Sequence, residues 1–572
     1  MNEINIECLN DNKDIKLLDV TKLISKKDII SFDIYDTLII RSFVQPNDVF
    51  KFLEKNENIK GFYKARLKAE KKVRRYYKHI KEDITINDIY AFMNPKYKNF
   101  IDIEKKYEIK YTNKHRKIFE IYQEALKQNK KIIFTTDMYL DRKTILQILS
   151  NNGYDNFYKL YISGEIGLTK RSGHLFQHVI NDLKIEPNKM LHIGDDLNND
   201  ILQAQNYNID TYKVDKYIEE FLYSSANKKF LEFYKKNKTN IYASILLSLY
   251  ARHSLLENNF KNFHEYLGYY IAGLSAYSYV QYINSISKNK DAILFIARDG
   301  YLLMRLYNKF FKYLPTYYIN AQRILSITST IDYKNIKQLL KIVSNNLDID
   351  LPKNKYMFHF FQYFILFKYR KLILTFIQKN KKEFKKYIDN VNIHESNLLS
   401  VDMVSAHFTS QLFLQRILTD KTINGAFFSS SLKNKHKNSF IFLPKKLFFK
   451  KYDIYRLVEY LFTSPKPPVE KIINGKIVYQ NMDLQQLKMQ QSRVYDIESG
   501  INKFVTEIIY NFSNIQIPQQ IVSDFIYSFI ENANDNDIIG YQSCKLDDGN
   551  VSNIFNTNLY TMLKSCIREK DI

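Results

Sequence analysis

Four groups of polar residues in the N-terminal part of the chain carry side chains suited to phosphoryl transfer. In chain order they are Asp33 with Tyr35, Asp36 and Thr37, then Thr136, then Lys170, and last Asp195 and Asp196 with Asp200. Phosphoryl transfer needs a carboxylate nucleophile, a hydroxyl and an ammonium for the non-transferring oxygens, and further carboxylates that bind Mg²⁺. Because the groups are far apart in the sequence, this chemistry requires a fold that brings them together.

Apolar segments precede these groups and predict strands that place them at one edge of a sheet. Asp33 directly follows IISF, Asp137 follows KKIIFTT, and Asp195 follows MLHIG. The shorter segment KLYIS lies between the last two. The helical patterns DRKTILQILSNNG and SGHLFQHVINDL alternate with them, which predicts βαβ units and a parallel sheet. A parallel sheet binds ligands at the carboxyl ends of its strands, so the groups are expected in one crevice.

Alternation along the second strand predicts that only one of its two threonines faces the crevice, and Thr136 is favoured over Thr135. Asp137 either joins the site or caps the helix that follows. Residues 45–128 show helical patterns with no strand and predict a helical insertion. Within it Arg66 and Glu70 have i, i+4 spacing, which predicts an exposed ion pair, with contact to the substrate as the alternative.

The four motifs, in this order, resemble those of the haloacid dehalogenase-like (HAD) hydrolase superfamily. FDIYDTL, IFTTD, GLTKRSG and IGDDLNND correspond to the first to fourth motifs. The resemblance implies Asp33 as the nucleophile that becomes an aspartyl-phosphate, Thr136 as a donor to a phosphate oxygen, and Lys170 as the bridge between nucleophile and phosphate. It implies that the insertion is a cap that selects the substrate. The cofactor implied is Mg²⁺, with the ligands Asp33, Asp195 and Asp196 and with Thr37 and Asp200 in support.

The second position after the nucleophile departs from the phosphatase pattern. Phosphatases of this superfamily usually have Asp there as the general acid, whereas this chain has Tyr35. Haloacid dehalogenases have Asp-x-Tyr, which makes attack on carbon an alternative. That reaction needs no metal and gains nothing from the carboxylates of the fourth motif. Asp36, where Gly is usual, is a second candidate for the acid, so Tyr35 and Asp36 are both expected catalytic residues.

A second alternation of strands and helices spans residues 288–432. DAILFIARDG, PTYYINAQ, NLLSVDMVS and INGAFFSSS each predict a strand that leads into a loop. Arg298 and Asp299 after the first of these strands and Asp402 in the third are candidate site residues, with a structural Arg–Asp pair as the alternative. The chain is therefore expected to be α/β, with a Rossmann-like core and a parallel sheet. The expected parts are a HAD domain at 1–220 with its cap at 45–128, a helical connector at 221–287, a second α/β unit at 288–432, and a mainly helical region at 433–572.

A narrower resemblance extends over most of the chain. SFDIYDTLIIRS, FYKARLKAE, FTTDMYL and SGEIGLTKRSG are similar to segments of large HAD-type proteins associated with bacterial surface-polysaccharide assembly, as are FIARDGYLL, VDMVSAHFTSQ, INGAFFSSS and EYLFTSPKPP. The resemblance implies a phosphorylated small-molecule substrate such as a sugar phosphate or glycan precursor. A second hypothesis is a weakened HAD domain that serves as a binding or scaffolding module beside a transferase-like second unit. Tyr35 favours this second hypothesis.

Composition limits the possible partners and compartment. The formal net charge of +24 comes from a Lys excess spread along the chain, so no specific nucleic-acid partner is expected. The three cysteines are far apart and favour a reducing compartment. The N-terminal segment carries acids and no apolar core, unlike a secretory signal, and the weakly charged stretch 266–283 predicts a buried helix. A cytoplasmic protein with at most peripheral membrane contact is expected, with no indication of its oligomeric state.

Overall fold

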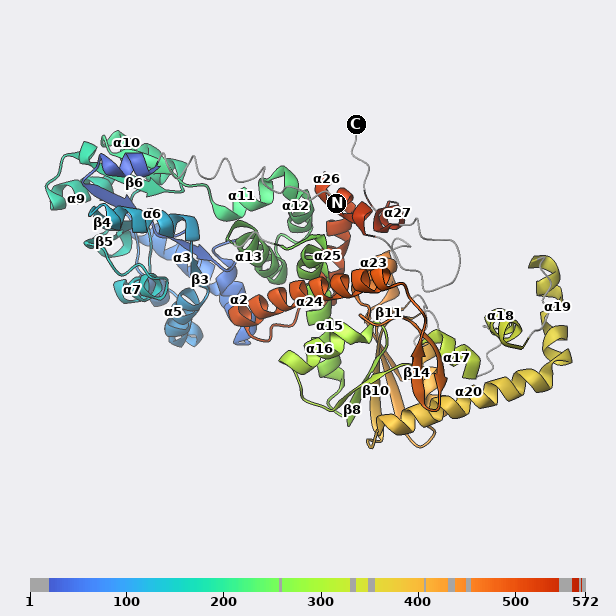
Figure 1. The fold of residues 1–572 in the computed structure, drawn as a ribbon. Coiled ribbons are helices and arrows are strands. Elements are labelled where there is room, and N and C mark those ends of the chain that lie inside the picture. Colours follow the sequence, from blue (N-terminus) through green and yellow to red (C-terminus); the bar gives the residue numbers. More distant parts are fainter. Residues whose placement is uncertain are drawn as a thin grey trace. The chain divides into compact units, whose positions relative to one another are not determined.

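The computed structural model describes residues 20–256, 260–329, 336–347, 355–405, 408–430, 438–448, 454–544, 558–564 and 567 (Figure 1). The chain forms two compact units, Met1–Asn258 and Asn259–Ile572, each built on a five-stranded sheet. The predicted fold class is confirmed: a Rossmann-like core with a helical insertion is followed by a second α/β unit and a helical C-terminal region. Among the described residues, no helix has the length and apolar character needed to cross a membrane.

The first sheet has β1 at its centre. Its order is β5-β4-β1-β6-β7, with every neighbouring pair parallel. The strands are β1 (Ile29–Phe32), β4 (Lys131–Thr136), β5 (Lys159–Ile162), β6 (Met190–Gly194) and β7 (Asp210–Lys213). From β1 the chain adds strands first on one side and then on the other, so the strand order reverses between β1 and β6. Ligands bind at the carboxyl ends of strands at such a reversal.

Helices cover both faces of this sheet. On one face, Tyr122 of α6 (Arg116–Lys127) meets the ring of Phe32, with centroids 6.4 Å apart. On the other, Phe176 of α9 (His174–Leu183) meets His192 at 4.9 Å. Burial on both faces explains the continuous apolar runs in the sequence. The other helices of this unit that follow β4 are α7 (Arg142–Asn151), α8 (Ser163–Ile166), η3 (Pro187–Lys189), η4 (Leu197–Leu202), α10 (Gln203–Asn206), α11 (Tyr217–Tyr223), η5 (Ser225–Asn227), α12 (Lys228–Lys236) and α13 (Ile241–Leu256).

A helical insertion leaves the sheet between β1 and α6. The antiparallel pairing of β2 (Ile39–Arg41) with β3 (Thr112–Lys114) joins its two ends. The expectation that this segment contains no strand is wrong, because β3 lies within it. The residues of β3, Thr-Asn-Lys, have no apolar pattern, and only the pairing with β2 makes them a strand. The insertion contains α2 (Asp48–Asn56), α3 (Phe62–Tyr77), α4 (Ile86–Ala91), η2 (Pro95–Phe100) and α5 (Ile101–Lys110).

The insertion has a charged residue at its core. Arg66 of α3 pairs with Glu70 at 2.8 Å as predicted, but it is fully buried, so the expectation of an exposed pair is wrong. Its guanidinium also binds both carboxylate oxygens of Glu104 on α5. Spacing within one helix could not reveal this partner from another helix. Removing either partner of such a buried pair leaves an uncompensated charge.

The second unit repeats the parallel architecture. Its sheet has the order β12-β11-β10-β8-β9, again with parallel neighbours. The strands are β8 (Ala292–Ile296), β9 (Thr316–Ile319), β10 (Asn397–Ser405), β11 (Thr422–Ser430) and β12 (Ser439–Leu443), and β13 (Val469–Ile473) with β14 (Lys476–Tyr479) forms an antiparallel hairpin. The sequence predicted β8 to β11, whereas β12, β13 and β14 lie in the region expected to be mainly helical. Residues 266–283 are helical and largely buried, as predicted.

The remaining helices of this unit fall into two sets, one outside the connection between β9 and β10 and one within it. The first set is α14 (Phe263–Leu267), η6 (Gly268–Gly273), α15 (Leu274–Ile286), α16 (Gly300–Phe310), α21 (Thr409–Ile417), α22 (Lys445–Phe448), α23 (Ile454–Leu461), α24 (Leu484–Phe512), α25 (Gln519–Glu531), α26 (Asp535–Ser543) and α27 (Leu559–Leu563). The group between β9 and β10 consists of α17 (Arg323–Ser329), α18 (Ile336–Leu347), α19 (Lys355–Lys368) and α20 (Arg370–Val391). In Figure 1 the long helix α20 leads from the sheet of this unit to α19.

Candidate active site

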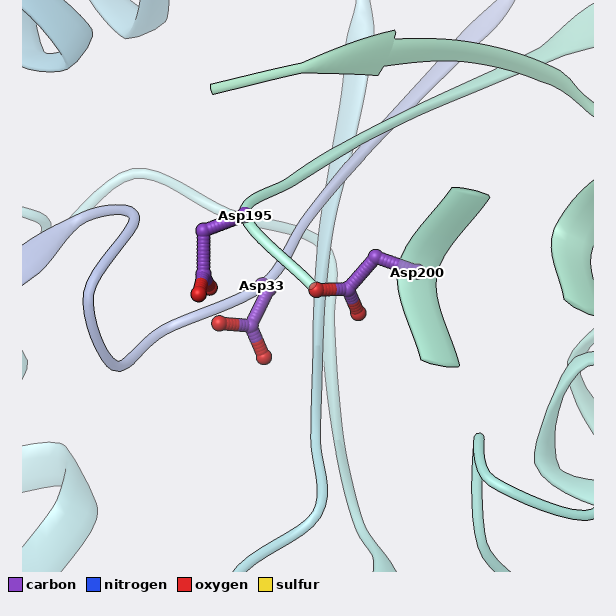
Figure 2. A group of neighbouring side chains, drawn as sticks. All are labelled: Asp33, Asp195 and Asp200. Carbon is purple, nitrogen blue, oxygen red and sulfur yellow. The ribbon is translucent and has the colours of Figure 1, made fainter. Parts of the chain in front are cut away.

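Three carboxylates meet at the carboxyl edge of the first sheet. Asp33 follows β1, Asp195 follows β6, and Asp200 lies on η4; their buried oxygens lie within 4.8 Å of one another. Figure 2 shows the three side chains pointing toward a common point. Gly194 makes room for this arrangement, because a Cβ there would lie 2.4 Å from Cγ of Asp200. The sheet thus brings together residues from the first and fourth motifs.

Lys170 neutralises part of this negative charge. Its ammonium contacts the Asp33 carboxylate and lies 2.5 Å from Oδ1 of Asp200, and the residue is buried. Asp137 holds the Lys170 loop by accepting hydrogen bonds from the backbone N–H of Lys170 at 2.8 Å and of Arg171 at 3.2 Å. The following helix α7 is instead capped by Asp141. Of the two roles considered for Asp137, the structure therefore shows the one at the site.

The helical insertion braces the loop that carries Lys170. Glu82 accepts hydrogen bonds from the backbone N–H of Thr169 at 2.8 Å and from the hydroxyl of Ser172 at 2.6 Å. Its neighbour Asp83 accepts one from the Ser163 hydroxyl at 2.5 Å, at the start of α8. The position of the Lys170 ammonium therefore depends on the insertion as well as on the sheet.

A row of buried polar side chains supports the cluster from behind. The hydroxyls of Thr135 on β4 and Ser31 on β1 lie 3.1 Å apart, and Ser31 lies 2.8 Å from Nδ1 of His192 on β6. Nε2 of His192 lies 3.3 Å from Oδ1 of Asp200. Sequence reasoning missed this row; its signal is the polar residues Ser31, Thr135 and His192 within otherwise apolar strand segments. The Thr135 hydroxyl is therefore used within the sheet, by its contact with Ser31. Thr136 is the last residue of β4 and is not part of this row.

The other residues expected near the metal differ in their placement. Thr37 donates a hydrogen bond to Oδ1 of Asp195 at 3.2 Å, in line with a supporting position. Asp196 lies apart from the carboxylate cluster: its Oδ1 accepts from the backbone N–H groups of Asn198 and Asn199 and caps η4. Lys216, which no motif marks, lies 3.4 Å from Oδ2 of Asp195.

Tyr35 and Asp36 occupy the loop after β1. The Arg41 guanidinium lies over the Tyr35 ring, 4.1 Å from its centroid. The Tyr35 hydroxyl is buried and has no hydrogen-bond partner among the residues that the structure describes. Burial, together with the nearby Glu108 carboxylate, raises the pKa of Tyr35. Asp36 adopts a left-handed backbone (φ 62°), which Asp tolerates better than most residues, and lies 3.8 Å from Arg41.

Comparison with known proteins assigns this part of the chain. Residues 27–208 match a family model described as a haloacid dehalogenase-like hydrolase. This segment is a HAD-like hydrolase domain. A comparison with curated protein sequences gives no match.

Solved structures with detectable likeness to the chain include several HAD proteins. L-2-haloacid dehalogenase from Xanthobacter autotrophicus has 13% identity and a TM-score of 0.26, over 33% of this chain and 77% of that one. The putative HAD-hydrolase YfnB from Bacillus subtilis, bound to magnesium, has 16% identity and a TM-score of 0.25, over 32% and 86%. A HAD family enzyme from Bacteroides thetaiotaomicron, in complex with magnesium and inorganic phosphate, has 16% identity and a TM-score of 0.24, over 33% and 95%. These scores are too low to transfer chemistry to this chain.

The electrostatics of the HAD site suit a divalent cation. Burial and the neighbouring carboxylates raise the pKa of Asp33, and burial with Asp36 and Asp200 raises that of Asp195 to about 6. Burial opposes ionisation of Asp200 too, but Lys170 and His192 hold its pKa below the usual value. A set of carboxylate oxygens is the donor set preferred by hard cations such as Mg²⁺. The residues present therefore fit the cofactor that the HAD motifs imply.

In metal-free protein we expect Asp195→Asn to raise the melting temperature at pH 7 by a few degrees and at pH 5 by about half as much. The pKa of Asp195 is about 6 in the folded protein, against ~3.9 when unfolded. Between these two pKa values the Asp195 carboxyl is mostly protonated in the folded protein and mostly ionised in the unfolded one. The free energy of unfolding therefore falls as pH rises through this window and stays lower above it. Asn removes that cost, of about 1–3 kcal/mol.

Thermal denaturation in EDTA at the two pH values measures this effect. Asp155→Asn, at an exposed position of the same domain, serves as the control and is expected to change neither melting temperature. Equal shifts at pH 5 and pH 7 in Asp195→Asn would show that repulsion at Asp195 is not the cause.

The second-unit candidates lie near the carboxyl ends of adjacent strands. Arg298 follows β8, and its Nε donates to the Thr463 hydroxyl at 3.2 Å. Asp402 on β10 accepts a hydrogen bond from Ser410 at 2.6 Å. Burial, together with the nearby carboxylates of Asp402 and Glu459, raises the pKa of Asp299. These residues remain candidates for a second site; His407, to which the sequence assigned no metal, lies outside the described residues.

Proposed function

We propose that the HAD domain is a Mg²⁺-dependent phosphohydrolase or phosphotransferase that acts through an aspartyl-phosphate at Asp33. The observation that carries this proposal is the meeting of Asp33, Lys170, Asp195 and Asp200 in one buried cluster. A carboxylate nucleophile next to an ammonium, with further carboxylates for a cation, is the combination that phosphoryl transfer needs.

Each residue has a role in this proposal. A carboxylate oxygen of Asp33 attacks phosphorus, the bond from phosphorus to the leaving oxygen breaks, and water then cleaves the acyl-phosphate to free phosphate and Asp33. The Lys170 ammonium, held between Asp33 and Asp200, stabilises the negative oxygens of the phosphoryl group. Thr136, at the end of β4, donates a hydrogen bond to one of these oxygens.

Asp33, Asp195 and Asp200 would hold the Mg²⁺, with Thr37 supporting Asp195. When bound, the cation offsets the charge that accumulates between phosphate and carboxylates. Asp200 here takes the place that the sequence suggested for Asp196, because the Asp196 carboxylate is used to cap η4. Lys216 keeps a positive charge beside Asp195, which orients that carboxylate.

The substrate in this proposal is a phosphorylated small molecule, such as a sugar phosphate or a precursor in surface-polysaccharide assembly. The sequence resemblance supports this part of the proposal. In this proposal the insertion acts as the cap, and the hydrogen bond from the Thr169 N–H to Glu82, which ties the insertion to the Lys170 loop, supports this role. Attack on carbon, as in a dehalogenase, is disfavoured because it has no use for the Asp195 and Asp200 carboxylates.

A second candidate function is a weakened HAD domain that binds phosphorylated ligands beside a transferase-like second unit. The buried Tyr35 hydroxyl favours it, because burial raises the pKa of this group and makes it a poorer proton donor. In this case the cluster would bind Mg²⁺ and phosphate with little turnover.

Hydrolysis of an aryl phosphate such as p-nitrophenyl phosphate, with Mg²⁺ and with EDTA, tests the proposal. We expect phosphate release that requires Mg²⁺ and that EDTA abolishes reversibly. Thermal stabilisation by Mg²⁺ without phosphate release would support the weakened domain instead. Halide release from a 2-haloacid that is indifferent to EDTA would overturn both.

A further inference from the structure

Helix α19 presents a row of aromatic side chains to solvent. Tyr356, Phe360, Tyr363, Phe364 and Phe367 have exposed fractions of 85, 81, 58, 59 and 76%. Their spacing of three, four and seven residues places them on one face of the helix. Contiguous exposed apolar area on this scale marks an interaction surface, because isolated hydrophobic residues, not clusters, are usual on protein surfaces.

The opposite face of α19 fixes this orientation. Ile365 is buried in a small core with Val343 of α18 and Ile373 and Ile377 of α20, and Gln362 is also buried. A rotation of α19 that hid the aromatic row would expose this core. The outward position of the aromatic side chains is therefore a consequence of the packing of α18 and α20 against α19.

The helix that follows is strongly basic. Residues 355–391 contain nine Lys and Arg but only two Asp and Glu. Lys368, at the end of α19, and Arg370 and Lys371, at the start of α20, are exposed. Lys371, Lys379, Lys382 and Lys386 follow one another at helical spacing along α20, and all are exposed. Lys368, Arg370 and Lys371 closely follow Phe367 in the chain, which puts these cations at one end of the aromatic row. The aromatic row of α19 and the exposed cations of α20 are called the α19–α20 surface below.

We propose that the α19–α20 surface docks the protein onto an anionic lipid bilayer. Helices that lie in a membrane interface combine aromatic residues on one face with Lys and Arg on another. Phe and Tyr rings enter the headgroup region, and the cations contact lipid phosphates. The charge argues against a second copy of this chain as the occupant, since pairing would bring two strongly positive surfaces together. This site is separate from the HAD cluster and does not depend on the function proposed for it.

Vesicle co-sedimentation of the full-length protein tests the proposal. The two preparations are phosphatidylcholine alone and phosphatidylcholine with about one third phosphatidylglycerol. We expect the protein to pellet with the anionic vesicles, weakly with the neutral ones, and less as salt rises. Two double variants should each weaken partitioning of the protein onto anionic vesicles about tenfold or more. One combines Tyr363→Ser with Phe367→Ser, and the other combines Lys371→Glu with Lys379→Glu. Tyr510→Ser, at an 84% exposed position on α24, is the matched control and should leave it unchanged.

Two results would overturn the proposal. One is vesicle binding that is absent, or equal in wild type and in both double variants. The other is a dimer, seen by analytical ultracentrifugation, that Tyr363→Ser with Phe367→Ser dissociates, which would make the surface a contact between copies. Unchanged melting temperatures and aryl phosphate hydrolysis in the variants show that fold and HAD site are intact.

Discussion

Asp33→Asn is expected to lower kcat/KM for an aryl phosphate by at least ~10⁴-fold while leaving the fold intact. The amide has the shape of the carboxylate and can still accept a hydrogen bond from Lys170. It cannot form the acyl-phosphate, so the reaction loses its covalent step. The loss of one negative charge from a cluster in which burial and repulsion raise the pKa of Asp33 does not destabilise the protein.

Steady-state kinetics and thermal denaturation of the same preparations measure both parts of this prediction. Asp155→Asn, prepared in parallel, is expected to keep wild-type activity, which shows that an Asp→Asn change and the purification do not by themselves remove it. Acid quenching during turnover should trap a phosphoryl group on Asp33 in the wild type. Activity of Asp33→Asn within a few-fold of wild type would mean that another nucleophile, or a contaminating phosphatase, carries the reaction.

Tyr35→Asp is expected to raise hydrolysis of a sugar phosphate by about 10²-fold or more with little change for an aryl phosphate. A well-placed general acid contributes ~10²–10⁴-fold, and only the alkyl leaving group needs the proton. The phenol of Tyr35 is a poor donor at neutral pH because burial raises its pKa. Arg41, which lies over the ring, would orient the new carboxylate.

The ratio of kcat/KM for the two substrates, in wild type and variants, measures this effect. Tyr35→Phe is the matched control, since it removes the hydroxyl and adds no acid; its ratio should equal that of wild type. A wild type that hydrolyses both substrates equally fast would show that an acid acts elsewhere. Asp36→Asn then tests the next candidate, and residues of the insertion follow.

The strands that position the site were predictable because they are buried on both faces. Such strands appear as apolar runs that end in acids, as at IISF before Asp33 and MLHIG before Asp195. β3, β7 and β14 were not recognised, because they are short and partly exposed and are defined by pairing with a neighbour. β12 has apolar residues, but only its place beside β11 at the sheet edge identifies it.

Convergence of the motif residues followed from topology, whereas their detailed roles depended on local geometry. Asp33 and Asp195 meet because the carboxyl ends of the neighbouring parallel strands β1 and β6 share an edge, and Lys170 reaches them from the loop after α8. Asp196 and Asp200 are both acids near one strand end, and composition does not say which turns inward. The cap that Asp196 provides to η4 and the space left by Gly194 bring Asp200 to the cluster.

The buried row behind the cluster fixes the direction of its protons. A carboxylate can only accept, so Nε2 of His192 carries the hydrogen that faces Asp200, and burial lowers the pKa of His192 and keeps the ring neutral. Nδ1 is then an acceptor, so Ser31 donates to it and in turn accepts from Thr135. A single tautomer is thereby selected across three strands. The charge on Asp200, which holds Lys170 in place, thus determines the hydroxyl orientations as far away as β4.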